Sequence, residues 1–427
     1  MRKTFVAFGL LMASTAVSAQ NYGQTPAAPP AVPQVDQRAT RAKTQAAAPA
    51  QRKINISKPA QKAVIDLQNA VAANDSATIP AKLAAAKAVA KTDEDRYYIG
   101  VLELRHGIAA KDNAMIASAL EGILASNQSS AEELPLNYLN LGKAYNNLKQ
   151  PEKAIPALER SIQLNPSDTE AVILLAETQA ARGQVAAAVD QLRKAIAVKQ
   201  ASGHKADEAW YKRALTLAYK ANLPATPEVA RAWIQAYPTS ANWKDAIRIY
   251  RNMARPPEPI LLDLLRLSRV TGSLDGDVDY NAYVFIAADQ RNAREGKTLL
   301  DEAAAAGKID INKPVYQDML KALKSRPMPG EDILAQSAAA QLAGSDGAAL
   351  LLTANRYYGI GNYARAAELF RAALAKPGVD KDQVNLQLGI ALAAAGDKAG
   401  AKAAFEAVAG TRAEVAKYWL AYLATKA

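Results

Sequence analysis

The chain has 427 residues, 50% of them hydrophobic, and its 52 Lys and Arg exceed its 41 Asp and Glu to give a formal net charge of +11. It contains no cysteine, which excludes disulfide bonds, thiolate metal ligands and cysteine nucleophiles. This length allows two or three domains, which hydrophobic cores alone must stabilise.

Residues 1–19 have the pattern of a cleavable secretory signal peptide. Arg2 and Lys3 precede an apolar run at 5–11, and small residues follow at the expected cleavage site. We therefore predict that the mature chain begins at Gln20. The alternative is an uncleaved anchor, but the apolar run is much shorter than the roughly 20 residues that a spanning helix needs.

The expected location is the bacterial periplasm or the outside of the cell. The chain has no cysteine that could carry a lipid, and no segment after the signal is long and apolar enough to cross a membrane. An exported protein meets little nucleic acid, so we expect no nucleic-acid partner despite the positive charge. Anionic envelope polymers or lipid headgroups are the electrostatic partners that this charge favours.

The remainder of the chain separates into a linker and a helical region. Residues 20–57 are rich in Ala, Pro and Gln and poor in large apolar residues, which predicts a disordered linker. From Lys58 onward the good helix formers Ala, Leu, Lys, Glu and Gln dominate, with short polar breaks between helix-length segments. The best strand candidate, at 283–286, lies inside a longer helical pattern, so the sequence predicts an all-α fold.

Four segments of the helical region share one spacing of small and large apolar residues. The first and second lie 34 residues apart, and the third and fourth lie 35 apart. The frame is found at Leu141, Gly142, Tyr145, Ala154, Leu158, Ser161 and Pro166; at Leu175, Ala176, Ala188, Leu192 and Ala195; at Ala354, Tyr357, Gly361, Ala366, Phe370 and Ala373; and at Leu388, Gly389, Leu392, Gly396, Ala401, Phe405 and Val408.

This spacing describes a hairpin of two antiparallel helices. Small residues such as Gly142 and Ala154 let the two helices approach closely, and the large residue at the place of Leu158 fills the gap between them. A glycine after the first helix supplies a left-handed cap, and Pro166 ends the second helix. A single hairpin cannot bury its apolar face, so neighbouring hairpins must stack.

The frame resembles the tetratricopeptide repeat (TPR), whose period is 34 residues. The resemblance implies antiparallel helix hairpins stacked into a right-handed superhelix, an α-solenoid, in an exported bacterial protein. Along the chain we expect divergent helical repeats at 58–134, a TPR pair at 135–203, degenerate TPR-like helical repeats at 204–345, and a C-terminal TPR pair with a capping helix at 346–427.

We find no motif for catalysis, a metal or a cofactor. The only histidines, His106 and His204, are too few for a zinc site. Residues 275–279 imitate the start of a calcium loop, but Tyr280 and Ile286 stand where that loop needs Gly and Glu, which indicates a polar turn. No phosphate-binding glycine loop or nucleophile elbow occurs. The expectation is a chain without a cofactor that is not an enzyme.

The resemblance also implies where a partner binds. In this family the first helices of the hairpins line a concave groove for a peptide, which maps onto Lys143, Asn146, Glu177, Asn355 and Tyr358. Glu177 and Ile390 occupy places where a carboxylate clamp would need other side chains, so we expect no such clamp. The predicted function is a scaffold for protein–protein interaction in the cell envelope, with a protein or peptide partner. The alternative is a component of envelope assembly or polysaccharide secretion that binds a glycan or a secretion-complex partner.

Overall fold

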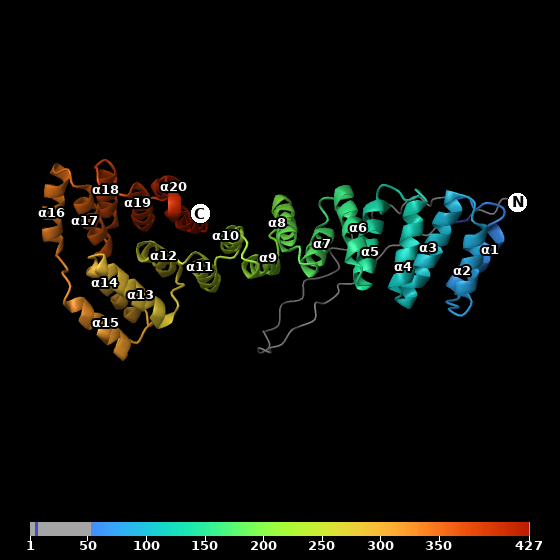
Figure 1. The fold of residues 1–427 in the computed structure, drawn as a ribbon, viewed down its shortest axis with the longest axis horizontal. Helices are drawn as coiled ribbons and strands as arrows, with labels where there is room; N and C mark the ends of the chain where they lie inside the picture. Colours follow the sequence, from blue (N-terminus) through green and yellow to red (C-terminus); the bar gives the residue numbers. More distant parts are fainter. Residues whose placement is uncertain (1–4, 7–52, 427) are drawn as a thin grey trace, which may run out of the picture. The chain divides into compact units, whose positions relative to one another are not determined.

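The computed structural model describes residues 5–6 and 53–426 (Figure 1). The predicted signal peptide, apart from Phe5 and Val6, and the predicted linker up to residue 52 lie outside the described residues. The described part confirms the all-α fold, with 21 α-helices and one 3-10 helix. Its only strands are the two-residue pair β1 (Phe5–Val6) and β2 (Lys53–Ile54), which run antiparallel.

The chain divides into two compact units, residues 1–171 and 172–427. The first unit stacks three helix hairpins around a core that extends from Ile56 to Ala157. These are α1 (Gln61–Ala72) with α2 (Ile79–Val89), α3 (Asp93–Ala110) with α4 (Asn113–Ala125), and α5 (Glu133–Asn147) with α6 (Pro151–Leu164).

Asp95 joins the start of α3 to the segment before α1. Its carboxylate accepts hydrogen bonds from the backbone N–H of Ser57 at 2.8 Å and from the Ser57 hydroxyl at 2.6 Å. The same carboxylate forms a capping box with Thr92 at the start of the helix. Burial raises the pKa of the Asp95 carboxyl, but these hydrogen bonds, with one from Lys91, bring it below its ordinary value. The charged form of Asp95 therefore stabilises this unit.

The α5–α6 hairpin shows the close approach that the repeat frame predicts. A Cβ atom added at Gly142 would lie 2.5 Å from Cδ2 of Leu158, so only glycine fits there. Ala154 is fully buried beside this contact, and the Ser161 hydroxyl donates to the carbonyl of Pro135 at 2.8 Å. These contacts explain why the frame needs two small residues and one large one.

The α3–α4 hairpin uses the same device, although its sequence matches no repeat frame. A Cβ atom at Gly100 would lie 2.8 Å from Cγ1 of Ile123, and one at Gly107 would lie 3.2 Å from Cγ1 of Ile116. The two glycines on α3 are seven positions apart, and so are their partners Ile116 and Ile123 on α4. The contact residues of both pairs lie at other spacings in the sequence than Gly142 and Leu158 do, which is why the TPR spacing does not reveal this hairpin.

The second unit continues from α7, in which the boundary between the units falls. Its helices are α7 (Thr169–Ala181), α8 (Val185–Ala201), α9 (Glu208–Lys220), α10 (Thr226–Ala236), α11 (Ser240–Ala254), α12 (Glu258–Thr271), α13 (Gly276–Asp289), α14 (Ala293–Ala305), α15 (Pro314–Lys324), α16 (Glu331–Ala343), α17 (Gly347–Gly359), α18 (Tyr363–Leu374), α19 (Lys381–Ala395), α20 (Lys398–Glu406), the 3-10 helix η1 (Gly410–Arg412) and α21 (Ala413–Ala424).

Side chains in this unit connect helices that lie one repeat apart in the sequence. Five such contacts join residues 31 to 36 positions apart in the region where the sequence pattern decays. They are Arg213 to Glu177, Asn242 to Glu208, Lys244 to Asp275, Asn252 to Tyr219, and Arg269 to Glu302. The repeat period therefore continues through the degenerate segment.

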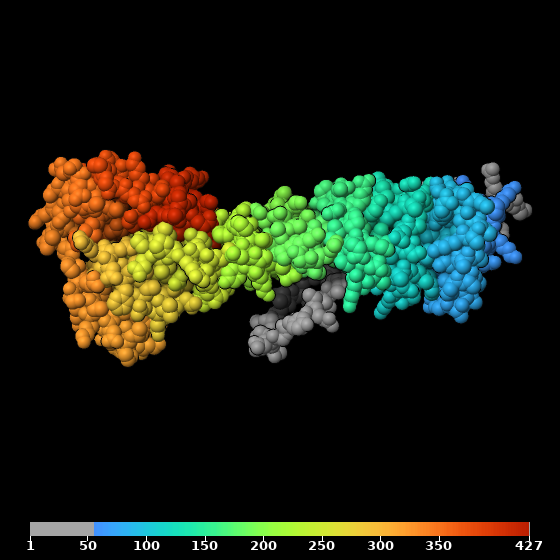
Figure 2. Space-filling model, in the orientation of Figure 1, coloured from blue at the N-terminus to red at the C-terminus, as the bar shows by residue number. Residues whose placement is uncertain are grey.

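The stack of the second unit does not continue in one direction. Helix α15 packs on α13 and α14, whereas α16 packs on α17, and α14 itself packs directly on α17. The last helix, α21, returns to α10 and α12, so that the red C-terminal helices lie beside the yellow-green ones (Figures 1 and 2). Trp419 of α21 is buried there, and its indole N–H donates to the carbonyl of Asp263 at 3.1 Å.

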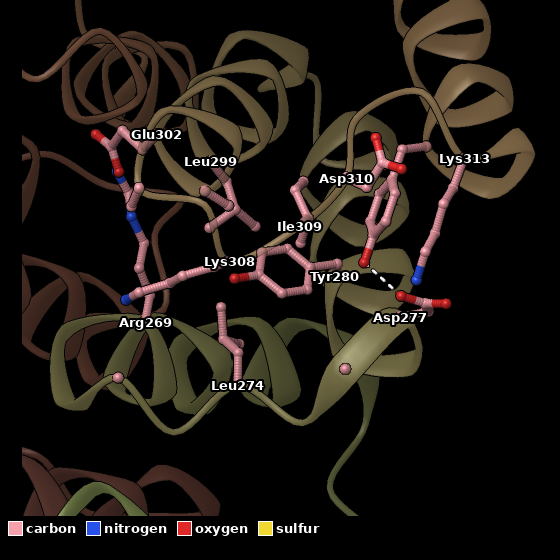
Figure 3. Close-up of a pocket in the computed structure, with 15 residues that line it drawn as sticks. Arg269, Leu274, Asp277, Tyr280, Leu299, Glu302, Lys308, Ile309, Asp310 and Lys313 are labelled. Atoms are coloured by element: carbon pink, nitrogen blue, oxygen red, sulfur yellow. Dashed lines mark hydrogen bonds and ion pairs between the residues drawn. The ribbon is translucent and has the colours of Figure 1, made fainter.

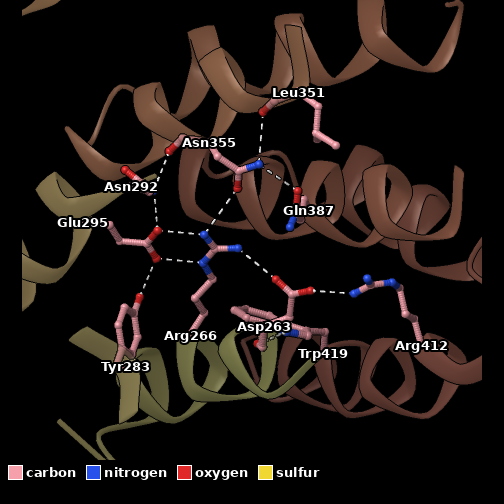
Figure 4. A network of polar contacts seen from close by, with 10 residues as sticks. All are labelled: Asp263, Arg266, Tyr283, Asn292, Glu295, Leu351, Asn355, Gln387, Arg412 and Trp419. Atoms are coloured by element: carbon pink, nitrogen blue, oxygen red, sulfur yellow. Dashed lines mark hydrogen bonds and ion pairs between the residues drawn. The ribbon is translucent and has the colours of Figure 1, made fainter. Parts of the chain in front are cut away.

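A buried ionic network lies where the returning helices meet α12 (Figure 4). Arg266 is 2% exposed and donates to both carboxylate oxygens of Glu295 at 2.7 Å and to Asp263 at 2.8 Å. The Tyr283 hydroxyl donates to Glu295 at 2.8 Å, and Arg412 donates to Asp263 at 3.3 Å. Although burial lowers the pKa of a guanidinium, the two carboxylates raise that of Arg266 well above its ordinary value. All these charges are paired, so the network holds helices together.

Replacing Gly142 by Ala should destabilise the protein, because the new methyl group overlaps Leu158; we expect a loss of about 1–3 kcal/mol in the free energy of unfolding. Gly122 of α4 is the matched control, since a Cβ atom there meets nothing within 4 Å. Gly122→Ala should stabilise by about 0.5–1 kcal/mol through helix propensity. Urea unfolding followed by circular dichroism measures both changes, and effects of the same sign would contradict this account of the hairpin.

Arg266→Met should destabilise the second unit by about 3–5 kcal/mol, because it leaves two buried carboxylates without their common partner. The control is Arg248→Met, which removes an arginine that is 58% exposed and paired with Asp245 on the surface. Exposed pairs contribute about 0–1 kcal/mol, so the control should unfold nearly as the wild type does. Similar midpoints for the two variants in denaturant unfolding would show that the network is unimportant for stability.

Candidate functional site

The structure places the predicted groove residues Lys143 and Asn146 in the first unit and Glu177 in the second. Lys143 forms an ion pair with Glu170 at 2.7 Å and is 37% exposed, while Asn146 is half-buried on the same helix. Glu177 accepts two hydrogen bonds from Arg213, at 2.9 and 2.7 Å. These pairs are accessible to solvent, where an ion pair contributes little to stability.

Asn355 and Tyr358 both lie on α17, and Asn355 is at the edge of the buried network (Figure 4). The Asn355 amide donates to the carbonyl of Leu351 at 3.0 Å and to the side chain of Gln387 at 2.9 Å. Tyr358 is 5% exposed, and its ring centre lies 4.8 Å from the guanidinium of Arg266. Because this ring is buried, Tyr358 offers little surface to a partner.

The predicted structural positions of the repeats line the interiors of the hairpins. Buried among them are Leu141, Gly142, Tyr145, Ala154, Ala354, Tyr357, Ala366, Phe370, Leu388, Gly389, Ala401 and Phe405, whereas Pro166 is exposed after the end of α6. In the last hairpin Gly389 faces the ring of Phe405, as Gly142 faces Leu158. The two frames thus use one packing arrangement.

One hollow in the second unit is lined by α12 to α15 and has a volume of about 750 Å³ (Figure 3). Tyr280 lies in its middle, with Arg269 and Glu302 on one side and Asp277 and Lys313 on the other (Figure 3). We call it the α13–α15 hollow. It is lined by Arg269, Gly272, Leu274, Gly276, Asp277, Tyr280, Leu299, Glu302, Ala303, Ala306, Lys308, Ile309, Asp310, Lys313 and Tyr316.

The ionisable groups of this hollow are suited to binding. Arg269 is paired with Glu302 at 2.5 Å, and the hydroxyl of Tyr316 donates to Asp277. Burial raises the pKa of Tyr280, and burial together with the hydrogen bond to Asp277 raises that of Tyr316. Both tyrosines therefore keep their protons at neutral pH and act as hydrogen-bond donors.

A second hollow, of about 560 Å³, adjoins the first and shares Gly276 and Asp277 with it. We call it the α11–α13 hollow, because its walls come from α11, the end of α12 and the start of α13. Arg251 of α11 pairs there with the buried Asp279 at 2.5 Å. Val278 also lines this hollow and is 73% exposed. The two hollows follow the first helices of consecutive hairpins.

Sequence reasoning found neither the hollows nor the network. Asp263 and Arg412 are 149 positions apart, so no local pattern connects them. One local signal was available, since Asp263 and Arg266 are charged residues within the apolar run 260–267. A charged pair three residues apart on an apolar helix face points to a buried partner elsewhere.

The residues singled out for metal chemistry do not form a site. Asp279 of the predicted polar turn accepts a hydrogen bond from the backbone N–H of Asp275 at 2.9 Å. His106 is buried and His204 is exposed. Within residues 5–6 and 53–426, no group of three or more His, Cys, Asp or Glu side chains could hold a metal ion, and no helix there has the length and apolar character to cross a membrane.

Comparisons with solved structures find helical repeat proteins at low TM-scores. The TPR protein YrrB, whose structure is described as having an unusual peptide-binding site, is 20% identical with a TM-score of 0.30, covering 42% of this chain and 87% of its own. A tetratricopeptide repeat protein from Parabacteroides merdae is 9% identical with a TM-score of 0.28, covering 76% and 98%. PilF of Pseudomonas aeruginosa is 12% identical with a TM-score of 0.25, covering 62% and 97%. These likenesses carry no argument about function.

The match to a protein-family model covers a single repeat. No curated protein matches the chain. Residues 137–168 match the family model of the tetratricopeptide repeat, and they form the hairpin in which Gly142 meets Leu158. Repeats of this kind stack into extended surfaces for protein–protein interaction. The chain therefore contains a tetratricopeptide repeat at residues 137–168.

Proposed function

We propose that the chain is a non-catalytic scaffold of the bacterial cell envelope that holds a polypeptide partner in its second unit. The observation that carries this proposal is the pair of hollows that share Gly276 and Asp277 and follow α11, α13 and α15. Their volumes are within the range of about 300–1,000 Å³ found for ligand pockets.

The lining of the hollows fits the chemistry of a polypeptide. A peptide backbone offers an acceptor and a donor at each residue, and the hollows present both kinds of group. Lys308 and Lys313 supply exposed ammonium groups, and Asp310 supplies a carboxylate. Apolar side chains can anchor against Val278, which lines the α11–α13 hollow and is 73% exposed.

The state of the polar groups favours binding over catalysis. Tyr280 and Tyr316 are protonated at neutral pH, and Arg269 is held in an ion pair. General acid–base catalysis would need a group whose pKa lies near the working pH and that can reach a substrate. The Arg266 network contains carboxylates, but they are buried and occupied by Arg266.

Export is supported by the sequence alone. The Arg2-Lys3 start, the apolar run at 5–11 and the small residues that follow have the order that a signal peptidase substrate needs. An envelope location would bring the scaffold together with periplasmic proteins. The alternative is that the same surface binds a glycan. Photocrosslinking distinguishes a glycan partner from a polypeptide.

A photoreactive amino acid placed at position 278 of the full-length protein should form a covalent adduct with a polypeptide in the producing cell envelope. The variant pair Lys308→Glu and Lys313→Glu should reduce that adduct, because both side chains line the adjoining hollow. The control site is position 402 on α20, where the side chain is 65% exposed and lies outside both hollows. Equal adducts from 278 and 402 would contradict the proposed surface, and an adduct sensitive to glycosidase would support the glycan alternative.

Mature protein isolated from the producing envelope should begin at Gln20 or at its cyclised form, because cleavage is expected after Ala19. N-terminal sequencing or mass spectrometry of the intact protein measures this. Material that retains Met1 would refute the cleavable signal, while the scaffold proposal would still stand on its own test.

A further inference from the structure

Three arginines surround a small pocket in the second unit, at the place where α15 and α16 separate. Arg291 precedes α14, Arg294 lies in its first turn, and Arg356 lies on α17. The remaining lining residues are Asn292, Ala293, Pro327, Pro329, Leu334 and Ile360. The lining thus contains three positive charges and no carboxylate.

The acidic groups nearest in sequence are engaged elsewhere. Asp289 pairs with Arg326 at 2.8 Å, Glu295 pairs with Arg266 at 2.7 Å, and Glu331 accepts a hydrogen bond from Asn362 at 2.9 Å. Among residues 5–6 and 53–426, no carboxylate forms an ion pair with any of the three pocket arginines. Their charges are therefore uncompensated within this part of the chain.

The guanidinium groups have little else to bind. Arg356 donates through Nε to the carbonyl of Arg291 at 3.3 Å, and Arg294 donates to the carbonyl of Met328 at 3.5 Å. The Nε atom of Arg294 is buried and has no hydrogen-bond partner in the structure. A buried donor without an acceptor is unfavourable, so this nitrogen is suited to an incoming acceptor.

The electrostatic surroundings also favour an anion. Burial and the neighbouring charge of Arg291 both lower the pKa of Arg356. Helix α14 begins at Ala293, beside the pocket, and no side chain caps its N-terminus. The free N–H groups at a helix start carry a partial positive charge that attracts anions. The mutual repulsion of the arginines and the partial positive charge at the start of α14 therefore both favour a bound anion.

We propose that this pocket binds one oxyanionic group, a carboxylate or a phosphate, on a ligand whose remainder stays outside the protein. Planar guanidinium groups match both oxyanions through paired N–H donors. The pocket volume of about 10 Å³ has room for about one water-sized atom, so one oxygen of the carboxylate or phosphate enters it and the rest of the ligand stays outside. This proposal is independent of the polypeptide surface at α11 to α15.

The test is isothermal titration of the full-length protein with inorganic phosphate and, separately, with N-acetyl-aspartate, at low and constant ionic strength. The wild type should bind at least one of the two, and chloride at the same ionic strength should not compete. Arg291→Gln and Arg356→Gln should each weaken binding by about tenfold, because each removes a charge-assisted hydrogen bond. Arg356→Lys should bind more weakly than the wild type and more tightly than Arg356→Gln, since it keeps the charge and loses the paired donors.

The matched control is Arg182→Gln, which removes an exposed arginine of the same unit outside the pocket. It should bind the anion as the wild type does. Without anion, Arg291→Gln should keep or raise the thermal midpoint, because it relieves repulsion, and it should lose most of the rise that the anion causes. A preference for phosphate or for N-acetyl-aspartate identifies the ligand group, and either preference supports the proposal.

Three results would overturn it. The first is that neither anion binds to the wild type. The second is equal binding by the arginine variants and the wild type. The third is a large fall in the thermal midpoint of Arg291→Gln without anion, which would assign this side chain a structural role.

Discussion

The pairing of Arg266 with Glu295 and Asp263 is the constraint on which the second unit depends. A buried guanidinium must have carboxylates within hydrogen-bond distance, since an unpaired buried charge is far less stable than a paired one. Arg266 and Asp263 lie on α12, Glu295 on α14, and Arg412 reaches Asp263 from η1. These distances fix the C-terminal helices against α12, so the hairpin stack folds back on itself.

This return of the chain explains where the accessible surfaces of the second unit lie. Trp419 packs on α12 beside Asp263, and the α11–α13 hollow lies along the middle and end of α11, the end of α12 and the start of α13. Because α14 packs directly on α17, α15 and α16 are not paired with each other. The segment between them, with Pro327 and Pro329, lines the arginine pocket together with the start of α14 and Arg356.

The first unit is held together in a different way. In two of its hairpins the paired helices meet through a glycine opposite a large aliphatic side chain, Gly142 with Leu158 and Gly100 with Ile123. Its main buried charge, Asp95, is satisfied by hydrogen bonds from Ser57 and Thr92 near one helix start. Such contacts act between neighbouring segments, so they set the geometry of each hairpin without closing the unit on itself.

The sequence by itself determined the helices, the repeat period and the packing inside the TPR hairpins. Gly142 and Leu158 are 16 positions apart, and a fixed hairpin length makes their contact predictable from spacing alone. Gly100 and Ile123 are 23 positions apart, so the spacing of the TPR frame did not reveal this contact. Only the tertiary structure decided that Tyr358 is buried and that Arg412 reaches Asp263. Those positions depend on small rotations summed over many stacked hairpins, and no local spacing in the sequence records that sum.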